Sequence, residues 1–261
     1  MTIPDLSSGQ FQLVSNMLSL SIAAMFGSFL FFVMSRQQLS AKYRPAMVMS
    51  SLVVGIAGYH YWRIYASWEH AYTLTSTGTY VASGSPFNDA YRYVDWLLTV
   101  PLLVAELVAV LALPKVTRNS IMPRLIAASA AMVALGYPGE VSGEAGVRVG
   151  WAVASTIPFI YILYVLWGEL SKAAAKNDAG TQVLLRNTKL LLLGTWGFYP
   201  IAYAMPLLGI GGAGALVALQ VGYTIADITA KCGYGFMICA IARSKMAAEG
   251  VTVDEDASVL A

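Results

Sequence analysis

A small set of ionisable residues lies inside stretches of the chain that are otherwise apolar. Asp227 and Lys231 lie in the stretch 213–241, and Arg92, Asp95 and Glu106 lie in the stretch 89–113. An ionisable side chain at membrane depth is costly unless it faces a partner or water, so such groups usually serve a function. These five residues are the first candidates for a functional site.

The spacing of these residues favours a reactive lysine with carboxylates beside it. Residues four apart share one face of a helix, which puts Asp227 about one turn from Lys231. Burial favours the neutral amine, which can attack a carbonyl carbon, so Lys231 is a candidate for Schiff-base chemistry. A retained protonated imine would need a counter-ion, which Asp95 and Asp227 could supply. The alternative is a structural ion-pair cluster that holds helices together.

The other ionisable stretch has its polar residues on one side. At 100° per residue, Arg92, Asp95, Thr99 and Glu106 fall within about 60° of one helical face. Asp95 and Glu106 are separated by about 16 Å of helical rise. This places one carboxylate near mid-membrane and the other close to the cytoplasmic end.

Aromatic residues recur near these groups. Trp96 adjoins Asp95, while Trp196, Tyr199 and Tyr203 follow helical spacing around Pro200. An aromatic stripe is by itself more typical of helix packing than of a cofactor pocket. Beside a buried lysine it becomes a candidate pocket wall.

The elements that must position these residues are membrane-spanning helices. Hydrophobic residues make up 57% of the 261 residues and charged residues only 11%, which excludes a soluble enzyme, a disordered chain and a nucleic-acid binder. Cys232 and Cys239 have neither disulfide nor metal-site spacing, and we expect no metal. Apolar stretches long enough to cross a bilayer recur at 10–34, 44–68, 89–113, 120–135, 147–170, 182–208 and 213–241.

We therefore expect a single all-α membrane domain of seven transmembrane helices, with a mobile tail at 245–261. The polar stretch 69–88 could form a short β-hairpin between the second and third helices. Lysine and arginine gather in the odd-numbered connections and the tail, which predicts an N-terminus outside the cell and a cytoplasmic C-terminus.

Together these residues resemble the microbial rhodopsins, in particular the proton-pumping proteorhodopsin and xanthorhodopsin branch. The resemblance covers about residues 8–245. It is carried by the segments RYVDWLLTVPLLVAEL (92–107), GTWGFYPIAY (194–203), DITAK (227–231), AGYHYWRIY (57–65) and ALGYPGE (134–140).

The resemblance implies a light-driven outward proton pump in the plasma or inner membrane of a microbe. All-trans retinal would be bound to Lys231 as a Schiff base. Asp95 matches the primary counter-ion and proton acceptor, Glu106 the cytoplasmic proton donor, and Thr99 the residue that couples the two. Protons and the lipid bilayer would be its partners, with no nucleic acid, and a homo-oligomer of three to six copies is implied.

The remaining matches surround these positions. Asp227 matches a second counter-ion held by the hydroxyls of Tyr61 and Tyr199. Arg92 matches the arginine that guides the proton outward, and His60 the histidine that hydrogen-bonds the acceptor. Trp96, Trp196 and Phe159 would enclose the retinal, with Tyr199, Tyr203 and Pro200 also lining its pocket.

Two positions and one stretch refine the match. Leu103 stands where leucine accompanies green absorption. Ala152 stands where a small residue admits a carotenoid antenna beside the retinal ring, which leaves a second chromophore open. The stretch 180–226 contains no carboxylate, so release of the proton must use other groups, such as Glu69, Glu140 or Glu144.

Three other functions remain alternatives. A photosensory rhodopsin would signal through a partner, a light-gated ion channel would pass ions passively, and a seven-helix protein without a chromophore would do neither. Glu106 speaks against the sensor, which gains nothing from fast reprotonation. In none of these readings is the chain an enzyme.

Overall fold

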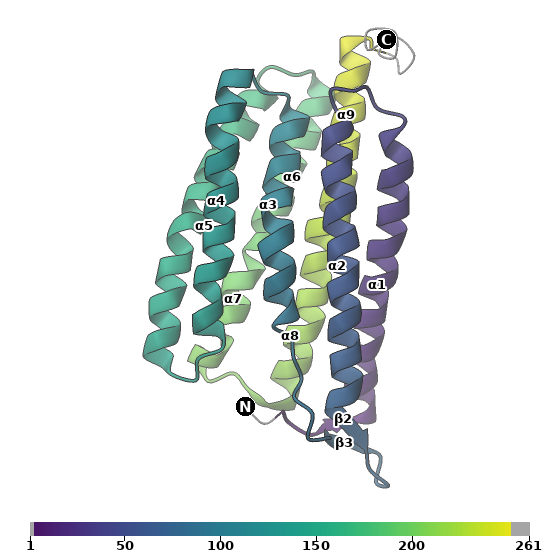
Figure 1. Cartoon of the computed structure of the whole chain (residues 1–261), viewed down its shortest axis with the longest axis vertical. Coiled ribbons are helices and arrows are strands. Elements are labelled where there is room, and N and C mark those ends of the chain that lie inside the picture. Colours follow the sequence, from purple (N-terminus) through teal and green to yellow (C-terminus); the bar gives the residue numbers. More distant parts are fainter. Residues whose placement is uncertain (1–2, 252–261) are drawn as a thin grey trace.

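The computed structural model describes residues 3–251, which fold into a bundle of long helices (Figure 1). A small sheet lies at one end of the bundle, here called the sheet end, and α9 finishes at the opposite end. The helices are α1 (Ser8–Arg36), α2 (Arg44–Ala71), α3 (Tyr91–Leu111), α4 (Lys115–Glu140), α5 (Ala145–Ala174), α6 (Ala179–Trp196), α7 (Phe198–Ala204), the 3₁₀ turn η1 (Met205–Leu208), α8 (Gly212–Asp227), the π-helical turn η2 (Ile228–Gly233) and α9 (Tyr234–Glu249).

These elements make seven rods within the described residues. Helices α1 to α5 form one rod each, α6, α7 and η1 together form the sixth, and α8, η2 and α9 form the seventh. The predicted seven-helix, all-α architecture is confirmed. Six of the rods are long and apolar enough to cross a membrane by length and composition, and the more polar α2 is the seventh.

The polar stretch between the second and third helices forms the predicted hairpin. Strands β2 (Tyr72–Leu74) and β3 (Thr79–Ala82) pair antiparallel, with Leu74 opposite Tyr80. Strand β1 (Leu6–Ser7) pairs with the other edge of β3, giving the order β1-β3-β2. The sheet therefore fastens the start of α1 to the loop that leads into α3.

Two rods change their helical geometry beside the centre of the bundle. Pro200 has no N–H to donate to the carbonyl of Trp196, and the sixth rod is interrupted between Trp196 and Phe198. The seventh rod widens into η2, which contains Lys231. Such wide turns often mark functional positions in helices.

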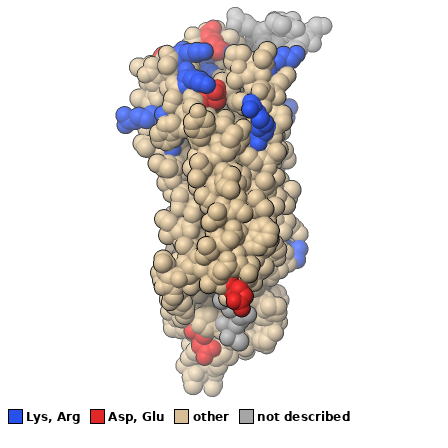
Figure 2. Space-filling model, turned by 90° about the vertical axis from the view of Figure 1, so that its left-hand side faces the viewer, with Lys and Arg blue, Asp and Glu red and all other residues tan. Residues whose placement is uncertain are grey.

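The outer surface is apolar around the middle of the bundle. Large side chains such as Leu30, Ile157, Tyr164 and Ile201 are more than half exposed, as expected for a surface that faces lipid. On the face shown in Figure 2, lysine and arginine gather mainly at the end away from the sheet. The chain is a multi-pass membrane protein.

Several helices run beyond the predicted spans, because polar turns continue a helix past its apolar part. The fourth span, predicted at 120–135, is Lys115–Glu140, and the seventh continues to Glu249. The first residues of the predicted tail 245–261 are therefore helical, and 252–261 lie outside the described residues. Cys232 and Cys239 are buried free thiols.

Candidate functional site

The centre of the site is Lys231, which is almost completely buried between two carboxylates. Its Nζ lies 2.8 Å from Asp227 Oδ1 and 3.2 Å from Asp95 Oδ2. The first pair joins residues four apart across η2, and the second joins the seventh rod to α3. The four-residue spacing predicted only the first pair, while the second depends on how α3 packs against the seventh rod. The structure brings together the lysine and the two carboxylates.

Asp227 is held by several donors. Tyr61 donates its hydroxyl hydrogen to Oδ2 over 2.8 Å, and Tyr199 donates to Oδ1 over 2.5 Å. The indole of Trp96 lies 3.4 Å from Oδ1. Both hydroxyl contacts that the resemblance implies are present. Hydrogen bonds to a carboxylate stabilise its ionised form, so Asp227 is built to stay charged.

Asp95 has a different environment. Both of its oxygens are buried, and neither receives a hydrogen bond from a described residue. Thr99, one turn further along α3, donates its hydroxyl to the backbone carbonyl of Asp95 over 2.8 Å instead of to the carboxylate. The nearby ammonium of Lys231 is therefore the main group that compensates this charge.

His60 is buried on α2, where its Nδ1 lies 3.0 Å from the carbonyl oxygen of Ile56. Among the described residues the structure gives no hydrogen bond between His60 and Asp95. When Nδ1 carries the proton that it donates to this carbonyl, Nε2 of the neutral ring is an acceptor. Such a ring can accept a hydrogen bond from a protonated carboxyl, but not donate one to a carboxylate.

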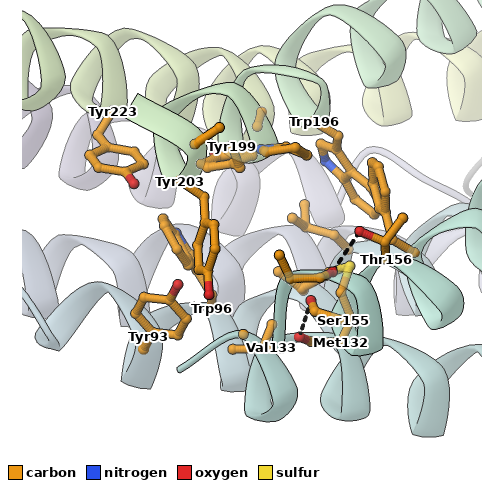
Figure 3. Close-up of a pocket in the computed structure, with 18 of the residues that line it drawn as sticks. Tyr93, Trp96, Met132, Val133, Ser155, Thr156, Trp196, Tyr199, Tyr203 and Tyr223 are labelled. Atoms are coloured by element: carbon orange, nitrogen blue, oxygen red, sulfur yellow. Dashed lines mark hydrogen bonds between the residues drawn. The ribbon is translucent and has the colours of Figure 1, made fainter. Parts of the chain in front are cut away.

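Beside Lys231 lies a cavity of about 330 Å³. Figure 3 shows aromatic side chains from α3, α6, α7 and α8 pointing into it, with Met132, Val133, Ser155 and Thr156 on the other side. The residues that the sequence places around a chromophore line this cavity: Trp96, Leu103, Ala152, Phe159, Trp196, Tyr199, Pro200, Tyr203 and Lys231. Tyr61 does not line the cavity and donates its hydroxyl hydrogen to Asp227.

Glu106 lies on the same face of α3 as Asp95, on the side away from the sheet. It is fully buried, and its Oε2 accepts a hydrogen bond of 2.7 Å from the hydroxyl of Ser50 on α2. Its Oε1 has no hydrogen-bond partner among the described residues. A carboxyl in such a site avoids the cost of a buried unpaired charge by carrying a proton.

Lys245 lies beyond Glu106, at the end of α3. Its ammonium donates to the carbonyl oxygens of Val110 and Leu111 over 3.2 and 2.8 Å. These carbonyls lack helical partners because α3 ends here, and a positive charge is favourable at a helix C-terminus. Lys245 therefore anchors α9 to the end of the helix that carries Asp95 and Glu106.

Arg92 lies on the sheet side of Asp95 and is almost completely buried. Its Nη1 donates to the hydroxyl of Tyr61 over 3.1 Å, and its Nη2 donates to Oε1 of Gln220. Its guanidinium also stacks 4.9 Å from the ring centre of Tyr223. The four polar residues predicted for one face of α3 are thus all buried towards the bundle interior.

Sequence reasoning missed two polar partners in this site, Ser50 and Gln220. Both are uncharged, and an uncharged polar side chain in an apolar stretch is a weaker sign of a functional site than an ionisable one. Gln220 was detectable, because it is the amide side chain in the apolar stretch 213–241.

The fold and the site define a seven-helix membrane protein with an aromatic pocket beside a buried lysine. A family model described as bacteriorhodopsin-like protein matches residues 12–245. The chain belongs to this family, the microbial rhodopsins.

Known relatives support this assignment. The crystal structure of xanthorhodopsin, described as a light-driven ion pump with dual chromophore, is 52% identical, covers 96% of this chain and 100% of its own, and has a TM-score of 0.92. The structure of thermophilic rhodopsin is 50% identical, covers 95% of this chain and 100% of its own, and has the same TM-score. The green-light absorbing proteorhodopsin of Gamma-proteobacterium EBAC31A08 is 31% identical over 84% of this chain and 82% of its own.

Membership of this family implies retinal as the cofactor, and the residues present fit it. The buried amine of Lys231 opens onto an apolar, aromatic cavity that can enclose a polyene. Beside the amine, Asp95 lacks hydrogen-bond donors among the described residues and so needs a cation close by. Lys231 would hold the retinal, and Trp96, Trp196 and Phe159 would pack against it.

Proposed function

We propose that this protein is a light-driven outward proton pump, in which Asp95 accepts a proton from Lys231 Nζ and Glu106 returns one to it. A pump of this kind is a transporter and not an enzyme. The observation that carries the proposal is the buried Lys231 between Asp95 and Asp227, with the second buried carboxyl, Glu106, on the same face of α3. Xanthorhodopsin, to which the chain is similar, is a light-driven ion pump.

Retinal on Lys231 would supply the absorption of visible light and the change of shape that moves the proton-bearing nitrogen. The protein's own residues then decide which carboxylate takes the proton. Asp227 has the hydroxyls of Tyr61 and Tyr199 to stabilise its charge, and Asp95 has no such donor among the described residues. Protonation therefore costs less at Asp95, whose Oδ2 lies 3.2 Å from Nζ.

His60 would act after this transfer. Its Nδ1 is engaged with the carbonyl of Ile56, so the Nε2 of the neutral ring can accept a hydrogen bond from protonated Asp95. This contact would hold the proton on Asp95, away from Lys231. Thr99 fixes the backbone at Asp95 through its 2.8 Å bond to the carbonyl, and so orients the acceptor.

Glu106 would supply the returning proton. Its burial, with Ser50 as its one hydrogen-bond donor among the described residues, favours the neutral carboxyl, which can hold a proton until Lys231 needs one. Separate groups for acceptance and return make transport directional, provided that access to Lys231 switches between the two steps.

The orientation follows from the distribution of basic residues, and we place the sheet end outside the cell. The helix ends and connections at the opposite end carry Arg36, Lys42, Lys172 and Lys176, among others. Positively charged loops stay in the cytoplasm. Asp95 and Arg92 then lie on the outer side of Lys231 and Glu106 on the cytoplasmic side, which gives outward transport across the cell membrane of a microbe.

Two residues of the cavity wall bear on colour. Leu103 lines the cavity, and we propose green absorption, the colour named for the similar proteorhodopsin. Ala152 also lines it and is partly exposed, which leaves room for a carotenoid antenna. The absorption spectrum of the purified protein, with and without added carotenoid, tests both points.

Illumination of unbuffered cells that make the protein with retinal tests the proposed function. We expect light to acidify the medium and a protonophore to abolish the signal. The Lys231→Ala variant should show neither the visible absorption band nor acidification. A steady external pH in illuminated cells that show the band would contradict the proposal.

A further inference from the structure

A continuous series of polar contacts leads from the centre of the site to the sheet end. Tyr61 bonds Asp227 Oδ2 and accepts a hydrogen bond from Arg92. Arg92 donates in turn to Gln220 Oε1, and the amide Nε2 of Gln220 lies 3.3 Å from Asp89 Oδ2. The series therefore ends on a carboxylate that the mechanism described above does not use.

Asp89 lies where this series meets the outer surface. It is partly exposed, directly before α3, and its backbone carbonyl accepts a hydrogen bond of 2.9 Å from the N–H of Arg92. It lies in the turn before α3, six residues before Asp95 in the sequence. Arg92 thus lies between the two acidic residues along the chain, with Asp95 buried and Asp89 partly exposed.

Gln220 fixes this arrangement. Its side chain is fully buried and bonded at both ends, with its oxygen towards Arg92 and its nitrogen towards Asp89. Because an amide has a separate acceptor and donor, it can join a cation to a carboxylate in one orientation only. Gln220 therefore sets the position of Asp89 relative to Arg92.

The three release groups suggested by the sequence lie in other surroundings. Glu140 forms an ion pair of 2.6 Å with Arg148, and Glu69 accepts a hydrogen bond of 2.7 Å from Ser15. Glu144 is exposed at the start of α5. Within the described part of the chain, no hydrogen bond or ion pair joins these three to Arg92 or Gln220. Asp89 is thus better placed than the release groups suggested by the sequence.

We propose that Asp89 is the outermost proton-transfer group of the exit path and that Gln220 is its positioning residue. This inference rests on the proposed function. The proton that leaves Asp95 restores the carboxylate there, and an O–H bond forms at Asp89. That bond then breaks as the proton passes to water outside, which restores the Asp89 carboxylate. The positive charge of Arg92, between the two, opposes return of the proton inward.

Proton release after a single flash tests this inference. The complete retinal-loaded protein is reconstituted in lipid nanodiscs, with a pH-sensitive dye in the bulk solution and absorbance recorded at the same time. In Asp89→Asn we expect release to be delayed by about 10²-fold, the loss typical when a positioned proton-transfer group is removed. The visible absorption maximum should stay unchanged, because Asp89 does not contact Lys231.

Three further variants separate a transfer role from a structural one. Asp89→Glu keeps a carboxylate and should restore release to within a few-fold of the wild type. Gln220→Ala keeps the Asp89 carboxylate but removes the amide that holds it in place, so proton release should be delayed in this variant as well. Asp5→Asn is the matched control, because it makes the same change at an exposed carboxylate near the sheet. This variant should release a proton to the bulk solution at the same time after the flash as the wild type.

The outcomes distinguish the inference from the proposed function. Wild-type timing in Asp89→Asn, or a delay in Glu140→Gln without one in Asp89→Asn, would overturn the role of Asp89 and leave the pump intact. If Asp89→Glu does not restore the wild-type time of proton release, the proposed role of Asp89 is overturned as well. No proton release from wild-type protein that shows a normal absorption band would overturn the proposed function itself.

Discussion

Tyr199 donates its hydroxyl hydrogen to Asp227 over 2.5 Å, and this bond makes the two carboxylates beside Lys231 unequal. Asp227 also has Tyr61 as a donor, while no described residue donates a hydrogen bond to Asp95. A carboxylate with several donors keeps its charge, and one without them takes up a proton more easily. The inequality of two acids on either side of one amine is the physical basis of the proposed transfer.

Replacing the proposed acceptor tests this inequality. Asp95→Asn removes a negative charge 3.2 Å from Lys231 Nζ, which should shift the pigment to the red and stop transport. Absorption spectra and light-induced pH changes measure the two effects, with Asp5→Asn as the matched control. Undiminished pumping by Asp95→Asn would show that another group accepts the proton.

The support of Asp227 can be tested by removing one hydroxyl. Tyr199→Phe leaves the ring in place and deletes the bond to Asp227, which should destabilise the folded protein by about 1.5–3 kcal/mol, the usual worth of a hydrogen bond to a charged group. The thermal loss of visible absorption measures it. Tyr59→Phe, at an exposed tyrosine that bonds Arg63, should change this midpoint little. Equal effects from both changes would argue against a special role for Tyr199.

Glu106→Gln tests the proposed donor. The amide cannot deliver a proton, so reprotonation after a flash should slow by about 10²-fold or more at alkaline pH. The colour should hardly change, because Glu106 is about 16 Å from Asp95 along α3. Decay of the flash-induced absorbance change measures the rate. If decay stays as fast as in the wild type at alkaline pH, Glu106 is not the donor.

Much of this site could be predicted because the residues that share one face of a helix can be identified from the sequence of that helix alone. The face of α3 that carries Arg92, Asp95, Thr99 and Glu106 is buried as expected. Contacts between rods could not be read in that way. Ser50 and its neighbour Ser51 both contact a carbonyl of their own helix, but only Ser50 also reaches across to Glu106.

The same limit applies to the exit side. The local pattern marks Gln220 as an amide in an apolar stretch, but it does not show that Gln220 faces Arg92 or that Asp89 lies beyond it. The link between His60 and Asp95 was expected from the resemblance, and the ring instead uses Nδ1 on the Ile56 carbonyl. Seven spans and a hairpin, by contrast, follow from hydropathy and turn residues, and the structure has both.

Asp178 gives a prediction for pH outside the membrane. It caps the N-terminus of α6, and hydrogen bonds from the Thr181 side chain and backbone lower the pKa of its carboxyl below the usual value. A lowered pKa means that the ionised cap stabilises the fold above the unfolded value of about 3.9, and that this contribution disappears as pH falls through the lowered pKa.

In Asp178→Asn the amide oxygen can still cap α6, but the side chain no longer titrates. We therefore expect its thermal midpoint to fall less between neutral and acidic pH than that of the wild type. Retinal-loaded protein in detergent, followed by visible absorption, gives both midpoints. Identical acid sensitivity in the two proteins would show that the Asp178 cap does not contribute.

The central claim is that light energy moves protons through Asp95, and purified protein in liposomes tests it most directly. Vesicles that contain only the retinal-loaded protein should change their internal pH on illumination, in media with or without sodium and chloride. A protonophore should collapse the change, and Asp95→Asn should abolish it. A light-induced pH change that needs sodium or chloride, or none at all in vesicles with a normal absorption band, would contradict the account.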